Sequence, residues 1–417
     1  MNTTYLQVTA YDNIIARDGR PFGIGQRIRP LDWLMPSVVA GSFRTAWVKS
    51  TPSLEFTGSV CARLLRLAVS GAFPVANGQL YLPAPLDCLV EDSAAADMPA
   101  EGRRRRQTIH RLVPRPLPAG AGCDFPIQGL QPVMLPESGT EVFKPAERPA
   151  WWPLDRYREW LVTDRESFAG DWFDASFLRK PEQEYRDHVS LDAHRGAARQ
   201  GRLFATTGLH VRHLPRFREL AEATDPYRRN YQEISLTVRV TVPDEEPELA
   251  RGHVATWHPL GGERRLVHWQ TENHAALWQC PDAVRQALNT AQRVRLILAT
   301  PGIFKHGWRP GWLDDHLCGS PPGCGVQLRL VGVCSERWKA VSGWSLAPMD
   351  AQGKPSFSGP YKPGPKPIRR MVPAGSVYFF ECLGGNPADL AQLWLQPVCD
   401  DESECNDGFG LAIWGVW

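Results

Sequence analysis

The stretch that decides the fold lies near the N-terminus, with TTYLQVTAY at Thr3–Tyr11 and PSVVAGSFRTAWVK at Pro36–Lys49. The β-branched and aromatic content of the first segment predicts a strand. Pro36 is favoured in the first turn of a helix, so we expect a helix from Pro36 to about Lys49. A glycine-rich loop, Arg17–Gly25, joins the two segments. A strand, a loop and a helix in this order indicate the start of a chain that combines sheets with helices.

The predicted helix has two different faces. At 100° per residue, Val39, Phe43 and Ala46 fall on one face, which we expect to be buried. The opposite face carries small residues and one guanidinium, from Ser37, Gly41 and Arg44. Such a face allows a backbone or phosphate to approach closely, with the guanidinium as the partner of the anion. An ordinary solvated helix face is the alternative, and periodicity alone favours it.

Composition narrows the class of protein. The chain has 417 residues, with 47 Lys and Arg against 45 Asp and Glu. This length suggests two or three domains, and the hydrophobic share of 43% excludes wholesale disorder. The net charge of +2 excludes a uniformly basic nucleic-acid binder, so a site of that kind must be a local patch. No apolar run approaches a membrane span and no signal-peptide pattern is present, so we expect a soluble, cytoplasmic protein.

The rest of the chain reads as strands with a few helices. We expect helices at 55–70, 281–291 and 386–395, and strands at 231–242, 253–258, 264–270, 293–300, 326–334, 375–382 and 409–416. Strands flanked by helices twice over predict an α+β chain with two sheet domains, the second beginning near residue 226. The segment 91–150 is rich in proline and charge and reads as an insertion, with an arginine-rich run in its first half.

Positive charge is concentrated in two segments. Apolar runs at 183–191 and 202–211 flank the tip DAHRGAARQG and predict a long hairpin, and 179–218 has nine Lys and Arg against four Asp and Glu. The segment 351–380 has five Lys and Arg, no acid and several prolines, which predicts an extended loop that presents cations. By contrast, 400–407 carries five acidic residues. This segregation favours one anion-binding face and one face turned away from it.

Motifs for catalysis and metal binding are missing. The ten cysteines include no CxxC pair, and the sequence has no P-loop, HExxH, GxSxG elbow or dinucleotide-binding glycine motif. We therefore expect no metal, no cofactor and no enzymatic activity. A metal-independent nuclease needs only a placed His and Lys, and His188 is the first candidate for such a role.

Several short segments, in this order along the chain, resemble one family. They are RDGRPF (Arg17–Phe22), PSVVAGSFRT (Pro36–Thr45), LPAPLD (Leu82–Asp87), HVSLD (His188–Asp192), GRLF (Gly201–Phe204), ATPGIF (Ala299–Phe304), GW (Gly307–Trp308), PAGSVYFF (Pro373–Phe380) and GFGL (Gly408–Leu411). The family is the RAMP-superfamily subunit that caps the crRNA 5′ end in type III-B (Cmr) CRISPR effector complexes. The regions 91–150 and 245–290 contain no matching motif.

The resemblance implies an architecture and a set of partners. It implies two ferredoxin-like (RRM-like) RAMP domains, at 1–225 and 226–417. The first would carry the insertion near 91–150 and a thumb hairpin near 183–212, and the second a terminal glycine-rich loop. It also implies a noncatalytic subunit that holds the 5′ repeat-derived tag of crRNA in antiviral defence. The implied neighbours are the large polymerase-like subunit and the first backbone RAMP subunit, with target RNA reached only indirectly and no membrane contact.

The resemblance also implies which residues contact RNA. They lie in the loop before the first helix, on that helix, in the thumb, in the basic segments and in the C-terminal loop: Arg17, Arg20, Ser37, Gly41, Arg44, His188, Arg195, Arg199, Arg202, Lys305, Lys362, Lys366, Arg369, Arg370, Gly408 and Gly410. Two alternatives stay open. One is a metal-independent RAMP endoribonuclease that processes precursor crRNA through His188 and a nearby Lys; the other is a purely protein-bridging scaffold.

Overall fold

The structure is a computed structural model of the whole chain. It describes residues 2–18, 30–51, 54–93, 106–125, 127, 129–135, 143–169, 172–250, 253–345 and 364–417. In that part of the chain, no helix is long and apolar enough to cross a membrane.

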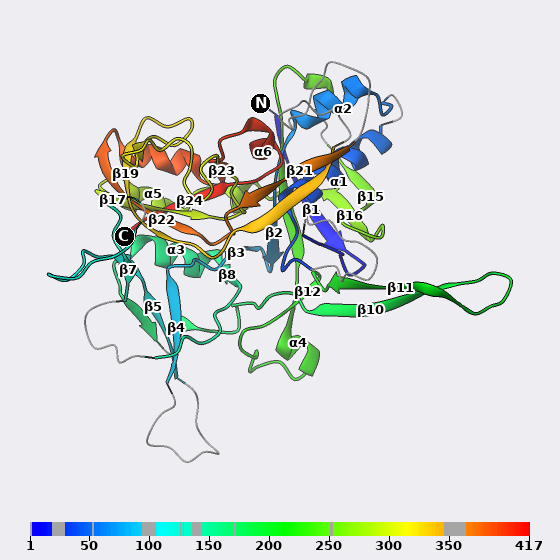
Figure 1. Cartoon of the computed structure of the whole chain (residues 1–417), viewed down its shortest axis with the longest axis horizontal. Helices are drawn as coiled ribbons and strands as arrows, with labels where there is room; N and C mark the ends of the chain where they lie inside the picture. Colours follow the sequence, from blue (N-terminus) through cyan, green and yellow to red (C-terminus); the bar gives the residue numbers. More distant parts are fainter. Residues whose placement is uncertain are drawn as a thin grey trace, which may run out of the picture.

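The first sheet has seven strands and is built around the predicted N-terminal strand (Figure 1). Their spatial order is β15 (Ala255–Pro259), β16 (Leu266–Thr271), β1 (Asn2–Ala10), β14 (Ser235–Val242), β2 (Ala68–Ala76), β3 (Gln79–Pro83) and β8 (Trp151–Pro153). All neighbouring strands in this sheet are antiparallel. The central strand β14, SLTVRVTV, is buried along most of its length because β1 and β2 flank it on both sides.

The second sheet has six strands from the C-terminal part of the chain. Their order is β18 (Cys318–Gly319), β19 (Gln327–Cys334), β22 (Val377–Gly384), β17 (Arg293–Leu298), β24 (Leu411–Val416) and β23 (Gln396–Pro397). These strands also pair only in antiparallel fashion. The chain is therefore a mixed α/β protein with mostly antiparallel sheets, as the α+β prediction required.

The two sheets share one strand order. Numbered along the chain, β1, β2, β14 and β16 lie in the order 4-1-3-2, and so do β17, β19, β22 and β24. The predicted boundary at 225/226 does not coincide with the division between the two sheets. Strands β14, β15 and β16 lie C-terminal to it, yet they complete the first sheet because β14 pairs with β1 and β2. The second sheet begins only at β17.

The described ranges contain six α-helices: α1 (Pro36–Lys49), α2 (Gly58–Leu65), α3 (Leu154–Val162), α4 (Pro226–Asn230), α5 (Asp282–Leu288) and α6 (Glu402–Asn406). The predicted helix at Pro36–Lys49 is confirmed at both ends. The helix predicted at 55–70 is shorter, because β2 begins at Ala68. The segment predicted as a helix at 386–395 is a 3-10 helix, Pro387–Leu393. Helix α1 contacts β2 and β15, whereas α3 and α5 contact β24.

Smaller ribbons extend from this body. The long hairpin predicted near 183–212 is present as β10 (Gln183–Leu191) and β11 (Ala198–Leu209), and it projects sideways from the sheets (Figure 1). A second ribbon joins β20 (Lys339–Ser345) to β21 (Gly364–Met371). The remaining strands form three small sheets: β4 (Cys88–Ser93), β5 (Arg106–Arg111) and β9 (Ser167–Ala169); β6 (Val113–Pro114) and β7 (Val133–Met134); and β12 (His213–Pro215) and β13 (Tyr231–Glu233).

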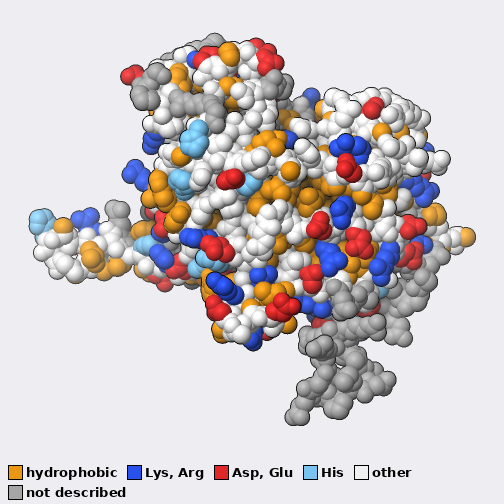
Figure 2. All heavy atoms as spheres, turned by 180° about the vertical axis from the view of Figure 1, so that it is seen from behind, with side chains coloured by type: hydrophobic (Ala, Val, Ile, Leu, Met, Phe, Trp, Pro, Cys, Tyr) orange, Lys and Arg blue, Asp and Glu red, His pale blue; other side chains and the backbone are white. Residues whose placement is uncertain are grey.

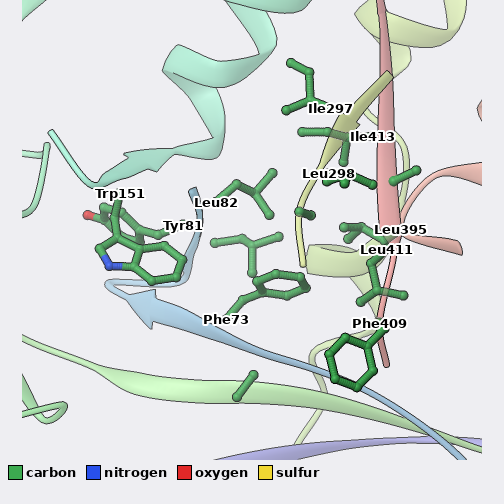
Figure 3. Packing of buried hydrophobic residues seen from close by; sticks show 14 of the residues in the cluster. Phe73, Tyr81, Leu82, Trp151, Ile297, Leu298, Leu395, Phe409, Leu411 and Ile413 are labelled. Carbon is green, nitrogen blue, oxygen red and sulfur yellow. The ribbon is translucent and has the colours of Figure 1, made fainter. Parts of the chain in front are cut away.

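The hydrophobic core runs without a break from one sheet to the other (Figure 3). Figure 3 shows Phe73, on β2 of the first sheet, on the same side as Leu395 and Leu411 from the second half. All three belong to one buried cluster. Because both sheets contribute to one core, the two halves of the chain form one body.

A buried ion pair crosses between the two sheets. Arg295 on β17 contacts Asp87, which follows β3, at 2.5 Å, and neither side chain has any exposed surface. Trp160 on α3 completes the group: its indole nitrogen donates to the other Asp87 oxygen at 3.2 Å, and its carbonyl accepts from Arg295. Arg111 also donates to the Trp160 carbonyl and lies over the Trp160 ring. The arginine-rich insertion therefore supplies a structural arginine, Arg111, to this group.

We expect Asp87→Ala to destabilise the fold by about 3–5 kcal/mol, because it leaves the Arg295 charge buried without its counter-ion. Urea unfolding of the full chain measures this loss. The matched control is Asp282→Ala, which removes an exposed carboxylate 3.9 Å from Arg285 and should change stability by less than about 1 kcal/mol. Equal effects of the two substitutions would contradict the role given to the buried pair.

Candidate RNA-binding surface

The β10–β11 hairpin exposes large apolar side chains along its whole length. Tyr185 and Leu203 are each 72% exposed, and Val189 is also exposed. Tyr185 pairs with Thr207 and Val189 pairs with Leu203, so these three apolar side chains share one face of the ribbon. A two-stranded ribbon with an apolar face has no core of its own. Its surface therefore points to recognition of another molecule.

The other face of the hairpin carries His188. Its ring stacks on Phe204 across the ribbon, with centroids 4.8 Å apart and planes 11° apart, and its Nε2 shares a 2.8 Å hydrogen bond with the Thr206 hydroxyl. Arg186 lies on this face as well and pairs with Glu184. The two faces of the hairpin thus differ, one being mainly apolar, with the exposed Asp187 among its side chains, and the other aromatic and polar.

Asp192 shapes the tip of the hairpin. One of its oxygens accepts from the backbone N–H groups of His194 and Arg195, and the other lies 3.8 Å from Arg199. The Arg195 side chain is exposed, and Gly196 has a φ of +62°, which allows the tight turn. The structure brings Arg195 and Arg199 together as predicted. The Arg202 side chain lies outside the described residues.

Helix α1 and the β20–β21 ribbon enclose a small cavity of about 80 Å³. Four of the predicted site residues line it, together with the exposed Trp344 of β20: Ser37, Gly41, Arg44 and Lys366. Two segments more than 300 residues apart in sequence therefore meet here. Gly41 is exposed and a Cβ there would meet no atom within 4 Å, so the face is open at that point.

The prediction that Arg44 lies on an open helix face is wrong. Its side chain is only 8% exposed and contacts Asp407 at 2.5 Å. It also donates to the carbonyls of Leu67 and Asn406, at 2.8 and 2.9 Å. Three donors are thereby used within the protein, so Arg44 fixes the C-terminal segment to α1 and is not available as a free phosphate ligand.

Lys366 belongs to the same cluster. Its ammonium lies 3.1 Å from the second oxygen of Asp407. Burial by itself would raise the pKa of Asp407, but Arg44 and Lys366 outweigh burial and hold that pKa below its usual range. Lys366 and Arg44 thus share the single negative charge of Asp407. The predicted contact between Lys366 and an RNA backbone is therefore restricted to the open side of the cavity.

The paired arginines on β21 differ from each other. Arg369 forms an ion pair with the buried Glu404, and burial lowers the pKa of Arg369. Arg370 is exposed and lies 4.9 Å from the centroid of the exposed Trp338 ring. Arg370 therefore presents a cation beside an aromatic surface, whereas Arg369 acts within the fold. Sequence reasoning missed Trp338, although its position between Arg337 and Lys339 was a usable signal.

The two C-terminal glycines pack against the protein itself. Gly408 and Gly410 have φ of +86° and +69°. A Cβ on Gly408 would lie 2.4 Å from the Val69 carbonyl oxygen, and one on Gly410 would lie 2.5 Å from the Cys399 sulfur. Another chain segment does approach both glycines closely, but it belongs to the protein itself. Gly408 lies against β2, and Gly410 lies against Cys399. Their assignment as RNA contacts is corrected accordingly.

The remaining predicted residues are scattered. Lys305 is exposed, and its backbone N–H donates to Asp400. Arg17 is exposed at an isolated bridge with Pro30. Arg20 and Lys362 lie outside the described residues.

A wider cavity of about 640 Å³ opens between the two halves, with Trp33 and Trp151 among its walls. Its charged side chains largely neutralise one another: Lys180 and Lys339 both contact Asp32, at 2.8 and 3.6 Å. Such a cavity offers aromatic surface but little net charge for a phosphate. In the described part of the chain, no cluster of three or more His, Cys, Asp or Glu could hold a metal ion.

Comparison with known proteins decides the family. Residues 6–417 match the sequence model of the family described as CRISPR-associated protein (Cas_Cmr3). The chain belongs to this family. The resemblance to a type III-B (Cmr) CRISPR subunit is thereby confirmed.

Solved structures and curated proteins add little to this assignment. Two cryo-EM structures of the type III-B Cmr-beta complex, one bound to cognate target RNA and AMPPnP and one bound to cognate target RNA, contain a similar chain. Each is 10% identical, covers 90% of this chain and 86% of its own, and has a TM-score of 0.43 or 0.42. No curated protein matches the sequence.

In this Cas_Cmr3 family member, we expect Arg44→Ala to lower the free energy of unfolding by about 3–5 kcal/mol, because it removes a partner of the buried Asp407. Thermal and urea unfolding measure the loss, and Arg44→Lys should recover only part of it. The control is Arg285→Ala, whose side chain is 56% exposed. A stable Arg44→Ala variant that lost RNA binding would contradict the structural role.

Acid should weaken the same cluster. The pKa of Asp407 is lowered in the folded state, so its pairing contributes stability above the unfolded value near 3.8 and loses it as pH falls through the folded pKa. We therefore expect the stability gap between wild type and Asp407→Asn to narrow below about pH 3.8. Urea unfolding at pH 7, 5 and 3 tests this, and an unchanged gap at pH 3 would refute it.

Proposed function

We propose that this chain is the noncatalytic crRNA-binding subunit of a cytoplasmic type III-B effector complex and holds the 5′ repeat-derived tag. The observation that carries the proposal is the projecting β10–β11 hairpin, with an apolar face, an aromatic face and arginines at its tip. Family membership supplies the context of a CRISPR complex.

The strand order supports a specific architecture. Both sheets have the 4-1-3-2 order of an antiparallel ferredoxin-like sheet. We therefore propose two ferredoxin-like RAMP domains, with the thumb hairpin inserted between β2 and β14 of the first. In the described residues, the crossover from β14 to β16 and the one from β17 to β19 contain no α-helix, so each domain lacks one helix of the full β-α-β-β-α-β pattern.

The hairpin suits the junction between tag and spacer. Exposed aromatic rings stack unpaired bases, and arginines at the tip contact the phosphates. Phe204 is 53% exposed although His188 stacks on it, so one side of this aromatic pair stays open. On the opposite face, Tyr185 and Leu203 supply apolar area that a neighbouring subunit can cover. We propose the large polymerase-like subunit and the first backbone subunit as these neighbours, with target RNA contacted only through crRNA.

The noncatalytic assignment rests on His188. Its contacts are a threonine hydroxyl and a phenyl ring, and neither is the lysine that the processing-nuclease alternative needs. Incubation of the purified chain with repeat RNA should give no cleavage, with or without metal. Cleavage that disappears in His188→Ala would replace this proposal with the nuclease alternative.

Salt dependence tests the hairpin tip. We expect the double substitution Arg195→Ala with Arg199→Ala to weaken binding of labelled crRNA and to reduce the log–log salt slope by about 1 to 1.5, since each lost contact with a single strand removes about 0.7. Fluorescence anisotropy at several salt concentrations measures both quantities.

Controls separate tip contacts from general charge and from protein bridging. Arg285→Ala, on α5, should leave the slope unchanged. Leu203→Ala should weaken RNA binding or subunit assembly more than Leu383→Ala, an exposed leucine on β22. If the tip variant binds crRNA like wild type while Leu203→Ala blocks assembly, the chain is a protein-bridging scaffold.

A further inference from the structure

One end of the first sheet has a face that α1 does not cover. On β16, Trp269 points toward α1 and its ring lies 5.5 Å from that of Phe43. His268, the preceding residue, must point to the opposite side, because successive side chains in a strand alternate. Across the sheet, His268 pairs with Thr9 on β1 and with Trp257 on β15. The side chains of Thr9, His268 and Trp257 therefore lie side by side on the face of the sheet away from α1.

We call this surface the β15 face and define it by the side chains that alternate onto it: Gln7, Thr9, Tyr11, Ala255, Trp257, Pro259, Leu266, His268 and Gln270. Two large aromatic rings are exposed on it, Tyr11 at 56% and Trp257 at 53%. Their centroids are 4.6 Å apart, and His268 lies 5.0 Å from Trp257. Figure 2 shows hydrophobic and histidine side chains gathered over β15 and β16, above the hairpin.

The chemistry of the β15 face favours RNA over a protein surface. None of its nine side chains is acidic, and its aliphatic members are Ala255, Pro259 and Leu266. The Arg212 guanidinium, which also pairs with Glu233 at 2.8 Å, lies 5.2 Å from the centroid of Tyr11. The exposed Arg264 sits beside the exposed Glu263 on the turn between β15 and β16. Exposed rings stack bases of any identity, amides and hydroxyls bond to base edges, and guanidinium groups attract phosphates.

We propose that the β15 face is a second RNA site, on which Trp257 and Tyr11 stack unpaired bases of a single strand that continues beyond the hairpin. Arg212, which follows β11, connects the root of the hairpin to Tyr11, so one strand can contact both surfaces. The proposal rests on the proposed function in that its ligand is RNA. It differs in that stacking on this sheet face does not depend on the tag sequence.

The test uses the full chain and a fluorescent oligouridine about 15 nucleotides long, which has no tag sequence. Trp257→Ala should weaken binding of this probe by about 5- to 100-fold, the loss expected from one base stack. Trp257→Phe should retain most of the affinity. A duplex of the same length should bind wild type and Trp257→Ala alike, since its bases are not available for stacking. Thermal unfolding of each variant confirms that the fold is kept.

Tyr11→Ala is a second test of the site, and Tyr227→Ala is its matched control. Tyr227 is also exposed and stacked, on Tyr231, but Glu182 and Glu233 lie near it. Tyr11→Ala should weaken oligouridine binding and Tyr227→Ala should not. Wild-type affinity of both folded Trp257→Ala and Tyr11→Ala variants would overturn the proposal, and so would a loss that Tyr227→Ala reproduces.

Two outcomes distinguish this site from the hairpin. If the hairpin-tip variant binds crRNA normally while Trp257→Ala loses oligouridine, the hairpin assignment fails and the β15 face stands. If Trp257→Ala binds oligouridine normally but no longer assembles with the other subunits, the face is a protein interface and the RNA proposal is wrong.

Discussion

The contact between Arg295 and Asp87 is the constraint on which the arrangement of the two sheets depends. Both charges are fully buried, so a packing of the sheets that parted them but kept them buried would leave each without its counter-ion in an apolar interior. Trp160 adds a donor and an acceptor to the pair and brings α3 against both halves. The geometry is therefore specified by hydrogen bonds as well as by apolar packing.

A second buried cluster fixes the C-terminal segment in the same way. Asp407 lies between Arg44 of α1 and Lys366 of β21, and Gly408 then passes against the backbone of β2. Arg239 on β14 adds a third polar contact between the two halves, since it donates to the Leu395 carbonyl at 2.7 Å. Charged side chains that would suit RNA at a surface are used here to join two sheets, each with a satisfied partner.

With the body joined in this way, the groups left for recognition lie on its projections and open faces. The hairpin and the outer side of the β20–β21 ribbon carry exposed aromatic and basic side chains, whereas the acidic segment near residue 404 faces the protein's own cations. The expectation that the acidic segment is turned away from the basic one is therefore wrong, because Asp407 and Glu404 pair with Lys366 and Arg369. Part of the positive charge is neutralised in this way, and the rest is presented to solvent.

The sequence by itself determined the local elements. The bounds of α1, the strand before it, the hairpin and most strands of the second sheet follow from periodicity and turn residues, because these signals act over a few neighbouring residues. Motif order also identified the family without any structure. In the candidate site, the exposed tip arginines were correctly placed because a hairpin tip has little to pack against.

Only the tertiary structure decided which charges are free. Arg44 falls on the polar side of an isolated helix, yet Asp407, 363 positions away, lies against that side and buries it. Arg369 is likewise buried by a distant segment, through its ion pair with Glu404. The tertiary structure alone also showed that β14 to β16 complete the first sheet and that the face around Trp257 stays open. Helical periodicity describes a helix without neighbours, and burial depends on which distant segment the fold places against it.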